Sequence, residues 1–85
     1  MNTKILIVDD EIDIVLMLRS FFESKGYLVL FATNGEEALK QIERQPNIIL
    51  LDINMPGLDG LEVCERIRNY ISCPILFLTA RIEDT

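Results

Sequence analysis

Apolar residues occur along this chain in four short continuous runs, and the segments between the runs have the spacing of amphipathic helices. The four runs are Lys4–Val8, Tyr27–Ala32, Asn47–Asp52 and Cys73–Thr79. A continuous apolar run of this length predicts a strand that is buried on both faces. Between the first two runs, Val15, Leu18 and Phe22 recur at helical spacing. The pattern therefore predicts strands and helices that alternate from the first strand to the fourth.

The three predicted helices cover residues 12–26, 33–45 and 59–70, and two of them carry recognisable end signals. Gly26 is a plausible C-terminal stop. Thr33 or Asn34 is placed to cap the second helix. Strands that alternate with helices predict an α/β fold, an open parallel sheet with helices on both faces.

Polar side chains stand where three of the predicted strands end. Asp9 and Asp10 follow the first strand, Asp52 ends the third, and Thr79 ends the fourth. Open parallel sheets bind ligands beyond the carboxyl ends of their strands. If these three strands are neighbours, three carboxylates and one hydroxyl converge there.

Three adjacent carboxylates repel one another, and a hard divalent cation relieves that repulsion. Mg²⁺ fits best, because it prefers oxygen ligands and leaves room for a phosphate oxygen. We expect Asp10 to hold the metal, Asp9 to hold it through a water, and the tight turn after Asp52 to aim the backbone carbonyl of Asn54 at it. With the metal in place, Asp52 can act as the nucleophile that forms an acyl phosphate, and the Thr79 hydroxyl can hydrogen-bond the phosphoryl group.

Each of these residues also has a purely structural interpretation. Asp9, Asp10 and Glu11 can simply cap the first helix, where acids favour the positive end of the dipole. Asp52 alone can be a turn residue, and Thr79 alone a helix cap. The functional interpretation depends on their combination, because independent caps rarely all fall in one layer of strand ends.

Composition narrows the classes of partner. The 85 residues carry 14 acidic against 8 basic side chains, a formal net charge of −6, so we expect no direct contact of this segment with nucleic acid. No apolar run approaches the roughly 20 residues that span a bilayer, so we expect no membrane segment. Cys64 and Cys73 lack metal-type spacing, and we expect free, buried thiols and a cytoplasmic location.

The segments "ILIVDDE", "LLDINMPGLDG" and "ILFLTA" together resemble the receiver domain of two-component response regulators. The resemblance covers essentially the whole chain. It implies a flavodoxin-like (CheY-like) fold with strand order 2-1-3-4-5 and phosphorylation of Asp52 by a partner sensor histidine kinase. By position, Asp9 and Asp10 resemble the acidic pair, Asn54 the carbonyl ligand and Thr79 the switch hydroxyl.

The resemblance stops after the fourth strand. Receivers continue with a further helix, strand and helix, which carry the lysine that pairs with the phosphoryl group, so we expect residues 1–85 to be a truncated receiver. In the parent protein, the receiver would then control an output domain, commonly a transcriptional one. The fourth strand is expected to have an open apolar edge, which a homodimer or a strand-exchanged oligomer can cover.

Two other functions stay open for the sequence. One is a receiver-fold interaction module that no longer accepts phosphate. The other is a phosphohydrolase of the haloacid-dehalogenase type, in which Asp52 is the nucleophile. That class needs a second acid two residues later, and the residue there is Asn54, whose amide cannot exchange a proton.

Overall fold

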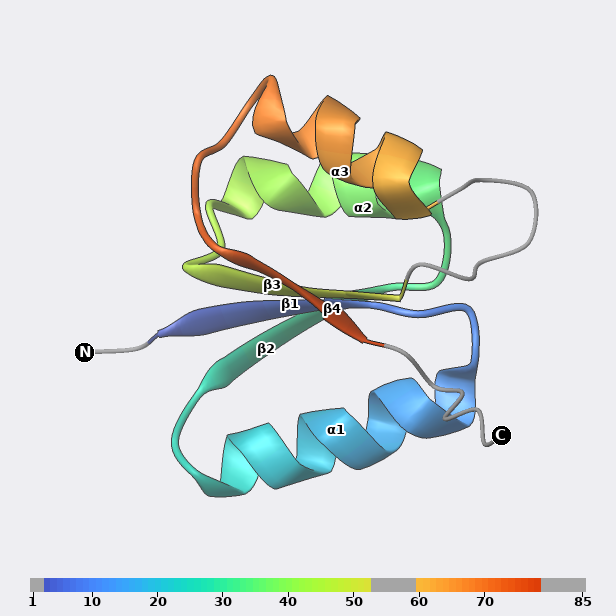
Figure 1. The fold of residues 1–85 in the computed structure, drawn as a ribbon. Coiled ribbons are helices and arrows are strands. Elements are labelled where there is room, and N and C mark those ends of the chain that lie inside the picture. Colours follow the sequence, from blue (N-terminus) through green and yellow to red (C-terminus); the bar gives the residue numbers. More distant parts are fainter. Residues whose placement is uncertain (1–2, 53–59, 79–85) are drawn as a thin grey trace.

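The computed structural model describes residues 3–52 and 60–78, and in them four parallel strands form one sheet (Figure 1). The strands are β1 (Lys4–Val8), β2 (Leu28–Ala32), β3 (Ile48–Asp52) and β4 (Ile75–Leu78). Their order in the sheet is β2-β1-β3-β4. This confirms the predicted α/β class, and the strand order is the one that the flavodoxin-like fold implies for its first four strands.

Three α-helices connect the strands and cover the two faces of the sheet. They are α1 (Ile12–Ser24), α2 (Gly35–Gln41) and α3 (Gly60–Arg68), and a 3₁₀ turn, η1 (Ile42–Arg44), follows α2. Helix α1 lies on one face, and α2 and α3 lie together on the other (Figure 1). Among the described residues, no helix combines the length and apolar composition that crossing a bilayer requires.

The continuous apolar runs exist because alternate residues of each strand enter different cores. In β1, Leu6 and Val8 pack on the α2–α3 side, whereas Ile5 and Ile7 pack on the α1 side. All four side chains are buried. A fully buried aliphatic side chain contributes about 1.5–3 kcal/mol to folding, so both faces stabilise the central strands.

Helix α1 stops before Gly26, as the sequence predicts, and its end has the form of a Schellman motif. Gly26 has a φ of 93° and donates its N–H to the Glu23 carbonyl, while Tyr27 donates to the Phe22 carbonyl. The rings of Phe22 and Tyr27 meet edge to face at 5.9 Å, which supplies the apolar contact that accompanies this motif. The chain is thereby turned directly into β2.

The second helix is shorter than the sequence predicts. The predicted helix over 33–45 ends at Gln41, continues as the 3₁₀ turn, and stops at Gln45, which has a φ of 59°. Proline explains this end: Pro46 cannot continue a helix and disfavours the helical conformation of the residue before it. The second strand begins at Leu28 instead of Tyr27, and the third helix ends at Arg68 instead of residue 70.

The start of α2 is fixed by side chains. The Asn34 side-chain oxygen accepts the Glu37 N–H at 2.8 Å, and the Glu37 carboxylate accepts the Thr33 N–H at 2.9 Å. The two hydrogen bonds that the Glu37 carboxylate accepts from Thr33, one from its N–H and one from its hydroxyl, lower the pKa of Glu37. The cap therefore settles the choice between Thr33 and Asn34 in favour of Asn34.

We expect Asn34→Ala to lower the free energy of unfolding by about 1 kcal/mol, because one helix N–H loses its partner. Urea unfolding followed by circular dichroism measures the change. Asn34→Ser is the matched control, since its hydroxyl can still accept the hydrogen bond. Equal losses in both variants contradict a capping role.

Candidate metal centre at the carboxyl ends of the strands

The pairing of β1 with β3 brings the first two acids of the site together. Val8 lies opposite Leu51, so the next residues along the two strands, Asp9 and Asp52, stand at the same edge of the sheet. The Asp9 N–H donates to the Ala32 carbonyl at 3.1 Å, which holds Asp9 against β2 as well. The position of Asp9 is thus set by the strands on both of its sides.

Three carboxylates gather at this edge. Asp9, Asp10 and Asp52 each offer an oxygen, and these oxygens all lie within 4.8 Å of one another. Asp9 is 2% exposed and Asp52 is 4% exposed, whereas Asp10 faces solvent. Carboxylate oxygens at this spacing suit a hard cation that keeps some of its waters, as Mg²⁺ does. The site can therefore hold such an ion with one side open to solution.

The pKa of Asp9 records the electrostatic cost of this arrangement. Burial raises it from 3.8 to about 6, a hydrogen bond from the Glu11 N–H opposes the rise, and the neighbouring charges of Asp52, Asp10 and Glu11 add to it. A buried carboxylate resists ionisation because the surrounding protein solvates charge poorly. The positive charge of a cation at this place would offset both the cost of desolvation and the repulsion.

The hydrogen bonds of the loop after β1 test whether its acids simply cap helix α1. The residue at the N-cap of α1 is Glu11, and its side chain makes no capping hydrogen bond. The Asp9 carboxylate instead accepts the Glu11 N–H at 3.0 Å. Asp9 thus orders the loop that carries Asp10. Sequence reasoning missed this role, although an aspartate two residues before an N–H is a known turn signal.

The other two expected site residues, Asn54 and Thr79, lie outside the described residues. The strand before Thr79 does lie beside β3, with Leu78 opposite Asp52. The roles assigned to Asp9, Asp10, Asp52, Asn54 and Thr79 stay predictions. Cys64 and Cys73 are free, as expected, but both are half-buried instead of buried.

Comparison with known proteins gives one family. Residues 5–85 match the family described as response regulator receiver domain. A curated relative, the alkaline phosphatase synthesis transcriptional regulatory protein PhoP of Bacillus subtilis, is 50% identical over 99% of this chain. The chain spans 36% of the length of that relative. The haloacid-dehalogenase alternative receives no support from these matches.

Solved structures of response regulators share the fold. The response regulator TrrA of Thermotoga maritima, in complex with Mg²⁺-BeF, matches with a TM-score of 0.83 and 42% identity, over 93% of this chain and 70% of that one. A chain in the complex of the histidine kinase ThkA with TrrA matches with a TM-score of 0.84 and 41% identity, over 95% of this chain and 72% of that one.

The raised pKa of Asp9 predicts how stability depends on pH without divalent ions. The folded state holds the Asp9 proton more tightly than the unfolded state, so the bound proton adds to the free energy of unfolding. This stabilisation is fully present below about pH 3.8 and is lost as the pH rises through 6. We expect Asp9→Asn to remove the loss and to stabilise the chain near neutral pH by up to about 3 kcal/mol, since a tenfold change in proton affinity is worth about 1.4 kcal/mol.

Urea unfolding in EDTA between about pH 4 and pH 7.5 measures this effect. Glu65→Gln is the matched control, because Glu65 is an exposed acid on α3 and is not among the charges that shift the pKa of Asp9. The gain from Asp9→Asn should shrink as the pH falls. A gain that is the same at every pH, or equal to that of Glu65→Gln, contradicts the prediction.

Proposed function

Because this chain belongs to the response regulator receiver domain family, we propose that it accepts a phosphoryl group on Asp52 in a two-component signalling system. The observation that carries the proposal is the cluster of Asp9, Asp10 and Asp52, whose oxygens lie within 4.8 Å of one another. Such a cluster costs stability, so a purely structural role explains it poorly.

Asp10, Asp52 and the backbone carbonyl of Asn54 would hold Mg²⁺ at this cluster, and Asp9 would hold it through a water. The ion supplies positive charge that offsets the negative charge of a phosphoryl group at this site. The acidic oxygens suit it, and the neighbouring TrrA structure contains Mg²⁺-BeF.

In the reaction, an Asp52 carboxylate oxygen attacks the phosphorus of a phosphohistidine on the kinase. The new bond joins that oxygen to phosphorus, the bond from phosphorus to the imidazole nitrogen breaks, and the imidazole leaves after it gains a proton. A carboxylate nucleophile carries no proton that must be removed, so this step calls for no general base. The Thr79 hydroxyl then donates a hydrogen bond to a phosphoryl oxygen and reads its presence.

The proposed partner is a sensor histidine kinase, supported by the ThkA–TrrA complex, in which a response regulator is bound to one. We further propose that residues 1–85 are part of a receiver domain that regulates a transcriptional output in the cytoplasm. The support is that PhoP, a transcriptional regulatory protein, is similar to this chain over 36% of its own length. In this role the chain is a signalling domain, and not an enzyme with a separate substrate.

We expect this chain to gain one phosphoryl group when it is incubated with Mg²⁺ and a small-molecule phosphodonor such as acetyl phosphate. Intact-mass spectrometry measures the addition. Asp52→Asn should abolish it, because an amide nitrogen or oxygen is a poor nucleophile. Glu11→Gln is the matched control: it removes a neighbouring acid outside the three-carboxylate cluster and should leave the addition in place.

The same experiment tests the metal. Addition should fail in EDTA, and Asp10→Asn should weaken Mg²⁺ binding by roughly tenfold, since affinity for a hard cation depends on the number of charged ligands. Addition that persists in Asp52→Asn contradicts the assigned acceptor. An absence of addition, with Mg²⁺ binding intact, favours the interaction module that does not accept phosphate.

The outer edge of β4 is the proposed site of self-association. In the described residues β4 pairs with β3 alone, and Leu76 and Phe77 are 52% and 44% exposed. An apolar strand edge of this kind can pair with a second copy or exchange strands with it. We expect light scattering on a dilution series to show a concentration-dependent dimer that Leu76→Lys abolishes. A monomer at every concentration contradicts this proposal.

A further inference from the structure

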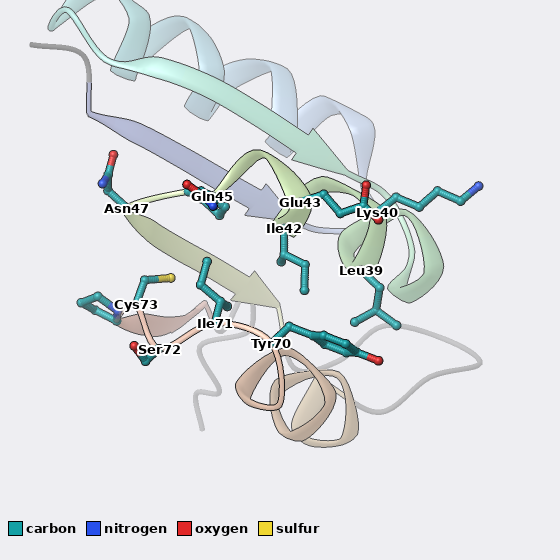
Figure 2. Close-up of a pocket in the computed structure, with 12 residues that line it drawn as sticks. Leu39, Lys40, Ile42, Glu43, Gln45, Asn47, Tyr70, Ile71, Ser72 and Cys73 are labelled. Carbon is teal, nitrogen blue, oxygen red and sulfur yellow. The ribbon is translucent and has the colours of Figure 1, made fainter.

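A groove of about 1010 Å³ lies at the opposite end of the sheet from the three carboxylates. One wall comes from the end of α2, η1 and the loop before β3, and the other from the loop between α3 and β4 (Figure 2). Asn47 and Pro74, which precede β3 and β4, both line it, so the groove is at the amino ends of the strands. Its volume lies at the upper end of the roughly 300–1,000 Å³ that is usual for small-molecule sites.

Both walls of the groove are held by hydrogen bonds that cross between elements. On one side, the Lys4 ammonium donates to the Arg44 carbonyl at 2.6 Å, and the Lys4 N–H donates to the Asn47 side-chain oxygen at 2.7 Å. On the other side, the Arg68 guanidinium donates to the Cys73 carbonyl at 2.5 Å. Walls fixed in this way form the groove in advance, which reduces the entropy that a ligand must offset.

The lining combines an apolar floor with an aromatic ring at the mouth. Ile42 is buried in the α2–α3 core, and Leu39 and Ile71 pack against that core from the two walls. Tyr70 is 76% exposed, and its ring lies beside Leu39 where the groove opens (Figure 2). An exposed ring above an apolar floor can stack on a flat aromatic group that enters the groove.

The charges of the lining favour a neutral ligand. Among the described residues that line the groove, the charged ones are Lys40 and Glu43, which have opposite signs, in a chain whose net charge is −6. The Lys40 side chain also points away from the groove (Figure 2). Among the described lining residues, an anion entering here meets no cation directed at it, in a molecule that is acidic overall, and a cation meets the single carboxylate of Glu43.

We propose that this groove binds a neutral, flat aromatic small molecule, which stacks on Tyr70 and covers Leu39, Ile42 and Ile71. The site is separate from the three carboxylates and does not depend on the phosphoacceptor proposal. Its ligand is recognised by apolar contact and ring stacking, with the polar rim at Gln45 and Ser72 available for hydrogen bonds.

Two dyes with the same ring skeleton test the proposal. N-phenyl-1-naphthylamine is neutral, and 8-anilino-1-naphthalenesulfonate differs by one sulfonate. The 85-residue chain is titrated into a fixed low concentration of each dye, and fluorescence is recorded. We expect saturable one-to-one binding of the neutral dye and weaker binding of the anionic one. Tyr70→Ser should lower the affinity for the neutral dye about three- to tenfold, which is the loss expected for one ring contact.

Phe21→Ser is the control, because Phe21 is an exposed aromatic residue on α1, which lies on the other face of the sheet from α2 and α3 (Figure 1). It should leave dye affinity unchanged. Amide NMR spectra provide a second measurement, in which shifts caused by the dye should gather in residues 39–47 and 70–74. The proposal is overturned if dye binding does not saturate, or if it is lost in Phe21→Ser but not in Tyr70→Ser. It is also overturned if the dye shifts the amide signals of α1 instead. Tighter binding of the anionic dye overturns the preference for a neutral ligand.

Discussion

The parallel register of β1 on β3 is the constraint on which the rest of this structure depends. Because Val8 pairs with Leu51, the next residue along each chain segment, Asp9 after β1 and Asp52 at the end of β3, stands at the same edge of the sheet. A slip of one residue in this pairing turns every buried side chain of the strand to the other face. Both faces of β1 are buried, so such a slip destroys two cores at once. The apolar interior thus fixes the position of the acids.

The burial of this apolar interior also offsets the unfavourable free energy of the clustered acids. A carboxylate that is 2% exposed and close to two other acids opposes folding, as the pKa of about 6 for Asp9 records. Fully buried aliphatic side chains such as Leu6 and Leu51 lie on the same two strands and each favour folding. Acids whose pKa is shifted by burial and by neighbouring charges are concentrated at functional sites. The unfavourable free energy of this cluster therefore supports the proposal that the acids form a cation-binding site.

The sequence predicted most of the architecture because its strongest signals are local. Continuous apolar runs placed the four strands to within a residue or two, and Gly26 and Asn34 marked helix ends through their own backbone and side-chain chemistry. The change from α-helix to 3₁₀ turn at Ile42 was not predicted, although Pro46 is a local signal that the helix must end before it. The groove could not be predicted, since its walls come from residues about 30 positions apart in sequence and depend on the packing of α2 against α3.

The sequence predicted which acids form the candidate site, but it did not predict how their surroundings differ. Asp9, Asp10 and Asp52 look alike in the sequence, because each follows an apolar run. In the structure, Asp9 is buried and accepts the Glu11 N–H, whereas Asp10 faces solvent. A side chain that is both fixed and desolvated holds its charge in one place, and an exposed one can exchange ligands with water. This asymmetry suits an ion that enters from the side of Asp10 and is positioned by Asp9. The burial of each acid, and not its presence alone, determines what it can contribute.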